Sequence, residues 1–510
     1  MQKKDNQKKS IMFKFLEWVE TAGNKLPDPF FIFVFLVGVV IILSFLLSRI
    51  GVQASHPVTN EAVVVKNLVS REGFQYMILN LLSNFTGFRP LGLVLSMMIG
   101  IGLAEQAGLM SSFMRKFILG APDKLLIAAV FLIGICGNIA SDAAIIIVPP
   151  LAGAIFYGAN KNPIVGVAAG YAAACAGFTA NLIIAGTDAL LAGISEEAAM
   201  IIDPTMTVSP LVNYYFMIVS TILLTIGGTW ITKKFVEKQA GEYIPEEGMD
   251  INVDEYELTE SENKGLRAAG ITTLIYWGII IIAMIPQNSV LRSDTGAIIG
   301  GTFISGIIPF ILFWFIAIGT AYGRKSGTIK EWSDVPAFMS KAMKGMSGYI
   351  VLVFVIAQFV SFFNWTNLGL ILAVKLGGLL KASNFTGMPM VIGVIFITMF
   401  INLFLGSGSA KWALLAPVFV PMFMMLDYSP AFAQLAYRIG DSTTNAITPL
   451  FPYIAVVLGF FQKYKKDSGL GTIFSLMLPY TIGFGLIWIV QITVWFLLNL
   501  PLGPGANVFM

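Results

Sequence analysis

Apolar residues run in long stretches along this chain of 510 residues, with short polar segments between them. A helix needs about 20 apolar residues to cross the hydrocarbon core of a bilayer, because each residue adds about 1.5 Å to its length. Seven stretches of this kind predict membrane-spanning helices. They lie at 30–47, 91–108, 211–231, 269–285, 297–322, 349–363 and 473–498.

Two further regions each consist of two short apolar arms with a polar break between them. The first pair, 125–135 and 143–156, is split by G-N-I-A-S-D, and the second, 390–405 and 413–425, is split by G-S-G-S. Each arm is too short to cross the bilayer comfortably. Each pair therefore predicts a re-entrant helical hairpin that enters and leaves on one side of the membrane.

Two longer apolar runs, 163–194 and 430–460, are broken in the middle by Gly, Ser, Thr and Asn. Lipid cannot satisfy the backbone groups that such a break frees, so the break must face protein or a wet cavity. With these two broken spans, we expect an all-α polytopic membrane protein with about nine transmembrane helices plus two re-entrant helical hairpins.

The two halves of the chain repeat the same order of elements. Ser141 is followed by Pro149 and Ser409 by Pro417, each eight residues later, and a proline then opens each broken span. The two predicted hairpins enter from opposite faces, so the halves form an inverted repeat, as in many secondary transporters.

This order predicts how the chain is divided. The first part comprises a cytoplasmic tail at 1–27, a first repeat at 28–234 with a hairpin at 124–158 and a broken helix at 163–196, and a cytoplasmic linker at 235–267. The second part comprises connecting spans at 268–322, a second repeat at 333–499 with a hairpin at 390–425 and a broken helix at 430–461, and a C-terminal tail at 500–510.

The composition and charge pattern agree with this topology. The chain is 56% hydrophobic and 12% charged, which is more apolar than a water-soluble core can hide. Lys and Arg gather at 3–9, 115–124, 233–238, 324–325 and 463–466, and the positive-inside rule assigns such clusters to the cytoplasm. We therefore expect a multi-pass protein of the bacterial inner membrane, with a cytoplasmic N-terminus, an external C-terminus and lipid around it. The sequence has no basic patch that would favour nucleic acid.

The chain contains two cysteines and one histidine, which limits its chemistry. Cys136 and Cys175 lie in apolar, small-residue segments and are expected to be buried free thiols, with a disulfide or a metal pair as the alternative. His56 lies beside a proline in a polar loop. A Ser-His-Asp triad or a multi-histidine metal site therefore lacks parts, and no cofactor is expected.

Small polar residues gather at the four predicted breaks. Half-helix N-termini favour anions, while free carbonyls and small polar side chains suit Na⁺, so the breaks are candidate ion and substrate sites. The alternative is that these residues only hold helices together. The candidates for binding Na⁺ or a coupled proton are Asn138, Ser141, Asn181, Asp441 and Asn445.

Charged residues at membrane depth are a functional hypothesis by default. Arg438 and Asp441 are three residues apart, so they can face each other as a structural ion pair; alternatively, Arg438 binds a substrate carboxylate. Asp188 has no basic residue close in sequence, so it is expected to be an unpaired carboxylate that carries a proton or is simply solvated. Trp412 either stacks on an aromatic substrate or packs in the core, and Lys411 either binds or extends to the interface.

The motifs of the second half resemble the p-aminobenzoyl-glutamate transporter (AbgT) family, within the ion transporter superfamily. The similarity rests on G-S-G-S-A-K-W-A-L-L-A-P, P-A-F-A-Q and Y-R-I-G-D-S, together with S-D-A-A-I-I-I-V-P-P, G-F-T-A-N-L and L-P-L-G-P-G elsewhere, and it extends over nearly the whole chain. The resemblance implies a homodimer whose subunits each have nine spans and two hairpins. It also implies secondary transport of p-aminobenzoyl-glutamate, with some members exporting sulfonamide antimetabolites.

The resemblance also assigns roles to particular positions. Asn402 matches a sodium-associated position, and Lys411 departs from the apolar residue that relatives can have there. The positions that match substrate-binding ones are Asp188, Ser409, Trp412, Pro430, Arg438, Asp441 and Pro449.

Three functions remain to be weighed. The first is a secondary transporter, symporter or antiporter, of p-aminobenzoyl-glutamate or a related aromatic carboxylate or amide, driven by H⁺ or Na⁺. The second is an exporter of sulfonamide antimetabolites that uses the same site. The third, an intramembrane protease, lacks an intramembrane histidine that would activate a serine.

Overall fold

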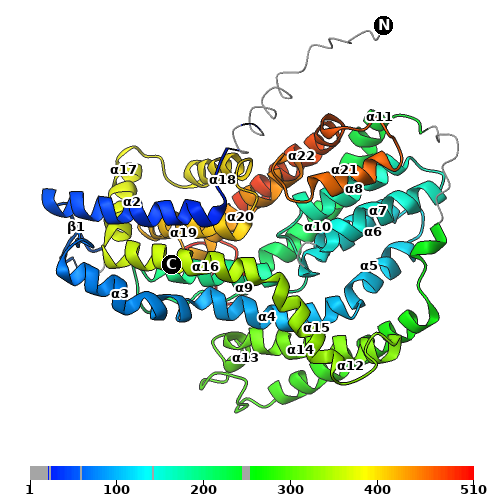
Figure 1. Ribbon diagram of the computed structural model, residues 1–510, viewed down its shortest axis with the longest axis horizontal. Coiled ribbons are helices and arrows are strands. Elements are labelled where there is room, and N and C mark those ends of the chain that lie inside the picture. The colour runs from blue at the N-terminus through cyan, green and yellow to red at the C-terminus, as the bar shows by residue number, and fades with distance from the viewer. Residues whose placement is uncertain (1–20, 22–24, 58–59, 141–142, 244–252) are drawn as a thin grey trace, which may run out of the picture.

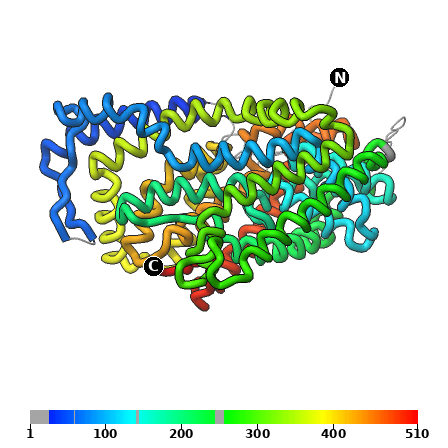
Figure 2. Tube along the Cα trace, turned by 90° about the horizontal axis from the view of Figure 1, so that it is seen from below, coloured from blue at the N-terminus to red at the C-terminus, as the bar shows by residue number. Residues whose placement is uncertain are grey.

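The computed structural model describes residues 21, 25–57, 60–140, 143–243 and 253–510, and these residues are almost entirely helical. One short hairpin of β1 (Gln53–Ser55) and β2 (Ala62–Val64) lies beside α2 and α3 at one end of the elongated molecule (Figures 1 and 2). The all-α prediction is confirmed.

Seven helical segments of the described chain are long and apolar enough to cross a membrane. One of them, Arg71–Gln106, comprises α3 (Arg71–Thr86) and α4 (Arg89–Gln106), between which the chain bends at Gly87 and Phe88. The others are α2 (Pro29–Ile50), α10 (Tyr214–Ile231) with η2 (Thr232–Val236) and α11 (Glu237–Ala240), α12 (Glu260–Met284), α14 (Ile307–Ser326), α16 (Ser347–Trp365) and α22 (Leu470–Leu498).

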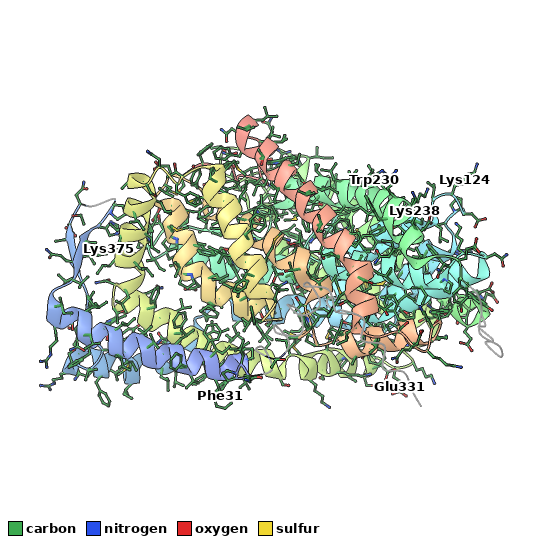
Figure 3. All side chains as sticks on the ribbon, turned by 90° about the horizontal axis from the view of Figure 1, so that it is seen from above. Phe31, Lys124, Trp230, Lys238, Glu331 and Lys375 are labelled. Atoms are coloured by element: carbon green, nitrogen blue, oxygen red, sulfur yellow. The ribbon has the colours of Figure 1, made fainter. Side chains whose placement is uncertain are left out.

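These helices carry apolar side chains on their outer faces. Phe31 and Trp230, which Figure 3 shows at the surface, are 60% and 58% exposed. Such surfaces on most of the long helices are expected where lipid replaces water as the solvent. The protein is therefore a multi-pass membrane protein.

The shorter helices pack between and beside the long ones. Several of them begin or end at clear sequence signals, such as Gly108 with φ +92° at the start of α5 and Asn367 with φ +60° before α17. The shorter helices outside the paired arms and the broken spans are α5 (Leu109–Leu119), η3 (Val253–Tyr256), α13 (Thr302–Ser305), α15 (Asp334–Gly345) and α17 (Leu368–Ala382).

The two pairs of short arms form consecutive helices separated by short breaks. The first pair is α6 (Leu126–Cys136), followed by η1 (Gly137–Ala140), and α7 (Ala143–Gly158); the second is α18 (Met388–Asn402) and α19 (Gly408–Met424). In the second pair the helix begins at Gly408, earlier than the predicted arm, because the Ser407 side chain accepts a hydrogen bond from the amide of Ala410 and caps it.

The two broken spans are also interrupted where the sequence predicts. The first consists of α8 (Pro163–Ala176) and α9 (Gly186–Ala199), and the second of α20 (Pro430–Thr444), η4 (Asn445–Ile447) and α21 (Ile454–Gln462). Each broken span packs closely on one short arm through a glycine. A Cβ at Gly166 would lie 2.5 Å from the Ala152 carbonyl oxygen of α7, and a Cβ at Gly440 would lie 2.6 Å from the Ile395 carbonyl oxygen of α18.

The buried apolar residues form two separate clusters. The larger one joins the short arms, the broken spans, α10, α16 and α22, and the smaller one joins α4, α12 and α14 around Trp314, Phe315 and Tyr322. Figure 1 shows α12 and α14 along one edge of the molecule, next to α4 and α5. The short arms and broken spans thus share a core that is largely distinct from the α4, α12 and α14 layer.

Three element boundaries differ from the expected ranges. The helix α12 begins at Glu260, inside the expected linker 235–267, because Thr259 and Glu262 form a capping box there. The expected span 297–322 begins with turns, and its long helix α14 starts only at Ile307. Residues 500–510, expected as a tail, instead pack against the protein, with Leu502 and Val508 fully buried.

Cys136 and Cys175 are both free thiols, and Cys175 is fully buried. The prediction of buried free thiols is therefore confirmed for Cys175, whereas Cys136 is a free thiol that is only partly buried. Within the described residues, no group of three or more His, Cys, Asp or Glu side chains could hold a metal ion.

Candidate functional site

A cavity of about 600 Å³ lies where three of the four breaks meet. Its walls combine hydroxyl groups, the two carboxylates of Asp28 and Asp441, and several aromatic rings. From the first broken span come Phe178, Thr179, Thr187, Leu190 and Leu191; from the break between α18 and α19, residues 404–409; from the second broken span, Tyr437, Asp441, Asn445 and residues 450–453; and from the approach to α2, residues 26–29.

Two half-helix N-termini face this cavity. Thr187 lies in the first turn of α9, and Gly408 and Ser409 are the first residues of α19. Helix N-termini carry free N–H groups and a partial positive charge, which favour anions. The cavity therefore has two places that suit a carboxylate, with the rings of Phe178, Tyr437 and Phe451 among its walls.

Asp188 and Arg438 form a buried ion pair directly behind the cavity wall. Arg438 Nη2 lies 2.6 Å from Asp188 Oδ1 and also donates to the Thr179 carbonyl oxygen at 2.8 Å. The other oxygen of Asp188 accepts hydrogen bonds from Asn181 at 2.9 Å and from the amide of Ala185 at 2.7 Å. The expectation of an unpaired Asp188 was wrong, because its partner is distant in sequence.

Asp441 has a different partner, Lys411. The Nζ of Lys411 lies 2.7 Å from Oδ1 of Asp441 and also donates to Oδ1 of Asn402. The lysine side chain is fully buried, so it does not extend to the interface. Arg438 and Asp441 therefore do not pair with each other. From α20, Arg438 pairs with Asp188 on α9 and Asp441 pairs with Lys411 on α19, so the site contains two ion pairs.

An asparagine at the end of each first arm holds the following broken span. Asn402 donates from Nδ2 to the Asp441 carbonyl oxygen at 2.7 Å, and to Thr444 and Asn445 at 2.8 Å each. Asn138 donates from Nδ2 to the carbonyl oxygens of Phe178 and Ala180, the latter at 2.8 Å. Both asparagines thus satisfy backbone or side-chain acceptors that the helix breaks expose.

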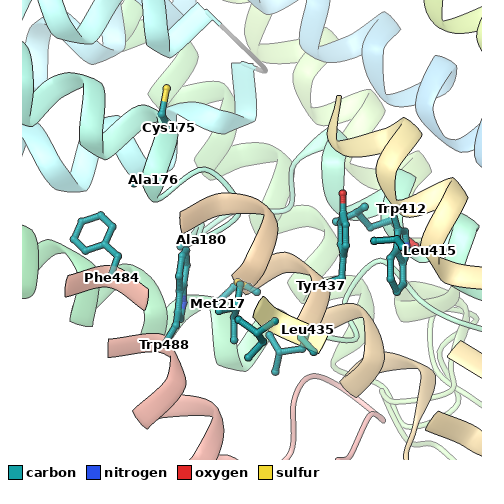
Figure 4. Packing of buried hydrophobic residues seen from close by; sticks show 14 of the residues in the cluster. Cys175, Ala176, Ala180, Met217, Trp412, Leu415, Leu435, Tyr437, Phe484 and Trp488 are labelled. Atoms are coloured by element: carbon teal, nitrogen blue, oxygen red, sulfur yellow. The ribbon is translucent and has the colours of Figure 1, made fainter. Parts of the chain in front are cut away.

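Trp412 lies behind the cavity rather than in its wall. Its ring stacks on that of Tyr437, with centroids 4.5 Å apart and an interplanar angle of 28°. Figure 4 shows these two side chains next to each other. Its indole N–H donates to the Ser195 hydroxyl at 3.0 Å. Trp412 therefore supports the ring of Tyr437, whose hydroxyl donates to the Gly408 carbonyl oxygen and to Asp441 Oδ1.

The remaining predicted residues fall into three groups. Ser409 and Asn445 line the cavity, together with Asp441. Pro430 is the first residue of α20, eleven residues before Asp441 and outside the cavity wall, and Pro449 lies buried in the turn after η4. Ser141 lies outside the described residues.

Sequence reasoning missed a buried polar chain that continues from Trp412. The Ser195 hydroxyl donates to Gln434 Oε1 at 2.7 Å, Gln434 donates to Asn213 at 3.0 Å, and Asn213 donates to the Ala431 carbonyl oxygen at 2.9 Å. The available signal was the presence of Gln434 and Asn213 within largely apolar surroundings. This series of hydrogen bonds connects α9, α10, α19 and α20.

A second cavity of about 800 Å³ lies between α5, α6, α12 and α14. Its walls are almost entirely apolar, with Lys116, Asn263 and Arg267 among the few polar exceptions. Its lining residues include neither an ion pair nor a half-helix N-terminus, both of which belong to the first cavity, so we take the first as the candidate transport site.

Comparison with known proteins identifies this architecture. Residues 14–510 match the family model described as the AbgT putative transporter family. The p-aminobenzoyl-glutamate transport protein of Escherichia coli (strain K12) is 42% identical over 495 residues, which cover 96% of each chain.

Two solved structures have the same fold. The YdaH transporter of Alcanivorax borkumensis aligns with a TM-score of 0.89 and 39% identity, over 94% of this chain and 100% of that one. MtrF of Neisseria gonorrhoeae, described as illuminating a class of antimetabolite efflux pumps, aligns with a TM-score of 0.91 and 37% identity, over 96% and 100% of the two chains.

Proposed function

Because this chain belongs to the AbgT family of transporters, we propose that it carries p-aminobenzoyl-glutamate, or a related aromatic carboxylate, across the bacterial inner membrane by secondary active transport. The observation that carries this proposal is the cavity in which two half-helix N-termini, hydroxyl groups and aromatic rings meet. The substrate named for the 42% identical relative has groups that complement this cavity: two carboxylates, which suit the helix N-termini, and one aromatic ring, which suits the aromatic side chains.

The cavity offers a place for each part of such a substrate. One carboxylate binds at the N-terminus of α19, near Gly408 and Ser409, and the other at the N-terminus of α9, near Thr187. The aromatic ring packs against Tyr437 and Phe178. Arg438 has a buried Nε without a hydrogen-bond partner among the described residues, so it can bind a carboxylate when its pairing with Asp188 changes.

The pairs around the cavity provide the coupling to movement. Asp188 and Arg438 join the first broken span to the second, while Lys411 and Asp441 join α19 to α20. A substrate carboxylate or a coupled H⁺ or Na⁺ alters the charge that these pairs must balance. Binding at the cavity therefore changes the strength of the contacts between the four interrupted elements.

The finer architecture follows the same reasoning. The seven long helices and the two broken spans together give nine crossings, with α6–α7 and α18–α19 as re-entrant hairpins of an inverted repeat. The Lys- and Arg-rich segments favour a cytoplasmic N-terminus and an external C-terminus. We further propose a homodimer, on the basis of the family resemblance.

Uptake into proteoliposomes tests the transport proposal. Purified protein should accumulate labelled p-aminobenzoyl-glutamate when a pH, Na⁺ or electrical gradient is imposed, and accumulation should collapse with an ionophore. Liposomes without protein are the control. The absence of gradient-dependent flux of p-aminobenzoyl-glutamate and of simpler aromatic carboxylates would contradict it.

Export of antimetabolites is the second candidate, and the structural similarity to MtrF favours it. Cells that produce the protein should then tolerate sulfonamides, and inverted vesicles should accumulate a labelled sulfonamide. Unchanged sensitivity, together with net uptake of p-aminobenzoyl-glutamate into intact cells, would decide for import.

A further inference from the structure

We infer that the ammonium group of Lys411 occupies the place of a coupling Na⁺ between Asn402 and Asp441, so that this chain transports without Na⁺. The inference rests on the proposed function and goes beyond it by excluding Na⁺ as the coupling ion. The Lys411 side chain lies on α19, and its Nζ lies between Asn402 of α18 and Asp441 of α20.

The oxygens that would suit Na⁺ are already engaged by this ammonium. Na⁺ prefers carboxylate, carbonyl and amide oxygens, which Asp441 Oδ1 and Asn402 Oδ1 supply. Lys411 Nζ lies 2.7 Å from the first and within hydrogen-bonding distance of the second, and its side chain is fully buried. These two oxygens therefore cannot coordinate Na⁺ while the lysine ammonium group remains between them.

A lysine at this position has to be explained, because it is the fourth residue of α19. Positive charge is unfavourable near a helix N-terminus and costly when buried. The carboxylate of Asp441 and the amide oxygen of Asn402 compensate for both costs. In return, the ammonium joins the start of α19 to α18 and α20, as a bound cation would.

Among the described residues, few other charged groups face this pair, and one of them is Asp28, which precedes α2 and lines the same cavity as Asp441. On α20, the Tyr437 hydroxyl donates to Asp441 Oδ1 at 3.2 Å, and Arg438 is already paired with Asp188 of α9. Of the other elements that pack on α19, α16 and α18 contain no Asp, Glu, Lys or Arg, and the lysines of α17 are exposed. The charged residues further along α9 are Glu196, which pairs with Arg89, and Glu197.

Thermal unfolding of the purified protein tests the inference without any transport substrate. Replacing choline by Na⁺ at constant ionic strength should leave the Tm of the wild-type protein unchanged. In Lys411→Gln, the freed oxygens of Asn402 and Asp441 should bind Na⁺, so Na⁺ should raise the Tm. A Na⁺-dependent rise in the wild-type protein would overturn the inference, whatever the variant does.

Transport provides the second measurement, with Lys375→Gln as the matched control because Lys375 is exposed on α17, as Figure 3 shows. The wild type and Lys375→Gln should accumulate substrate equally in Na⁺ and in choline medium under an imposed pH or electrical gradient, and a Na⁺ gradient alone should drive no accumulation by either. Lys411→Gln should lose at least tenfold of this accumulation, because α19 loses its contacts with Asn402 and Asp441. Na⁺-driven accumulation by the wild type would overturn the inference while leaving the proposed function intact.

A separate observation carries a second proposal: we propose that the cavity between α5, α6, α12 and α14 binds the acyl chain of an anionic phospholipid. The walls of this cavity, of about 800 Å³, are formed by side chains such as Phe113, Leu132, Leu274 and Trp314. Apolar walls of this kind suit a hydrocarbon chain.

Two cations among the lining residues of this cavity provide the charge complementarity. Lys116 and Arg267 are exposed lining residues, and among the described residues neither pairs with a carboxylate. The neighbouring Lys264 instead pairs with Glu260 at 2.7 Å. The two cations without a carboxylate partner select a negatively charged headgroup rather than a zwitterionic one.

The acyl chain of the bound lipid would reach the first break, which lies between α6 and α7. The lining residues also include Cys136 and Gly137, at the end of α6, and Leu182 and Ile183, in the unwound part of the first broken span. A bound lipid would therefore contact both the α12–α14 layer and the elements around the transport site.

Native mass spectrometry with phosphatidylglycerol and phosphatidylcholine tests this proposal. The wild type should retain phosphatidylglycerol in preference, and Lys116→Gln/Arg267→Gln should lose that preference, while Lys264→Gln should keep it. Equal retention of both lipids by the wild type would overturn it. A disulfide between two subunits with cysteine at Gly270 would also overturn it, because a second copy would then cover the cavity.

Discussion

Arg438 on α20 donates to Asp188 on α9 across 2.6 Å, although the two residues are 250 positions apart in the sequence. One belongs to the second half of the chain and the other to the first. Their side chains are 1% and 5% exposed, so the pair balances its charges inside the protein. This contact joins the two interrupted helices directly behind the cavity.

Removing one member of this pair should destabilise the protein strongly. Asp188→Ala or Arg438→Ala leaves a buried charge without its partner, which costs about 3–5 kcal/mol in comparable pairs. The double variant should be less destabilised than the sum of the two single variants, because neither charge is then left alone. Thermal unfolding in one detergent measures all three, and strict additivity would contradict the pairing.

Asn138 and Asn402 should have matching roles in the two halves. Asn138→Ala removes the donor to the carbonyl oxygens of Phe178 and Ala180, and Asn402→Ala removes the donor to the Asp441 carbonyl oxygen. Each change leaves buried acceptors unsatisfied, at about 1–3 kcal/mol per group. Both variants should therefore unfold at lower temperature and transport slowly. As a control, Asn84→Ala removes partly buried side-chain contacts with Gln358 and Tyr76 and should have a smaller effect.

Trp412 should act on transport through Tyr437. Trp412→Phe keeps an aromatic ring against Tyr437 but loses the donor to Ser195, so it should retain most of the substrate affinity. Trp412→Ala removes the support of the Tyr437 ring and should raise KM by about tenfold, as expected for a loss of about 1.4 kcal/mol in binding. Equal KM values for the two variants would show that ring support is unimportant.

The C-terminal segment should contribute to stability. The amide of Ser429, the N-cap of α20, donates to the Val508 carbonyl oxygen at 2.9 Å, and the amide of Phe216 on α10 donates to the Leu502 carbonyl oxygen at 3.2 Å. Deleting residues 501–510 exposes these amides and the pocket that holds Leu502 and Val508. The truncated protein should unfold at lower temperature than the full chain, and an unchanged Tm would contradict this packing role.

The architecture was predictable because it depends on local patterns. Apolar length identified the long helices, and the Gly, Ser and Asn breaks identified α8–α9 and α20–α21, since these residues weaken a helix in the middle of an apolar run. The helix boundaries at Gly408 and Glu260 were less accessible. They depend on single capping hydrogen bonds, and those bonds became visible only in the structure.

The pairing of charges could not be predicted, because it depends on tertiary contacts. The spacing of Arg438 and Asp441 favoured a local pair, yet each side chain has a partner on another helix. The polar chain through Ser195, Gln434 and Asn213 was missed for the same reason. Its members have no spacing that connects them in the sequence.

Substrate protection of a cysteine in the cavity tests the central claim most directly. In a background with Cys136→Ala and Cys175→Ala, Ser409→Cys places a thiol in the cavity wall. A soluble maleimide should label it, and p-aminobenzoyl-glutamate should slow the labelling at concentrations near its KM, while labelling of a Ser383→Cys control on the exposed end of α17 should be unaffected. Labelling of Ser409→Cys at the same rate with and without saturating substrate would contradict the assignment of this cavity as the transport site.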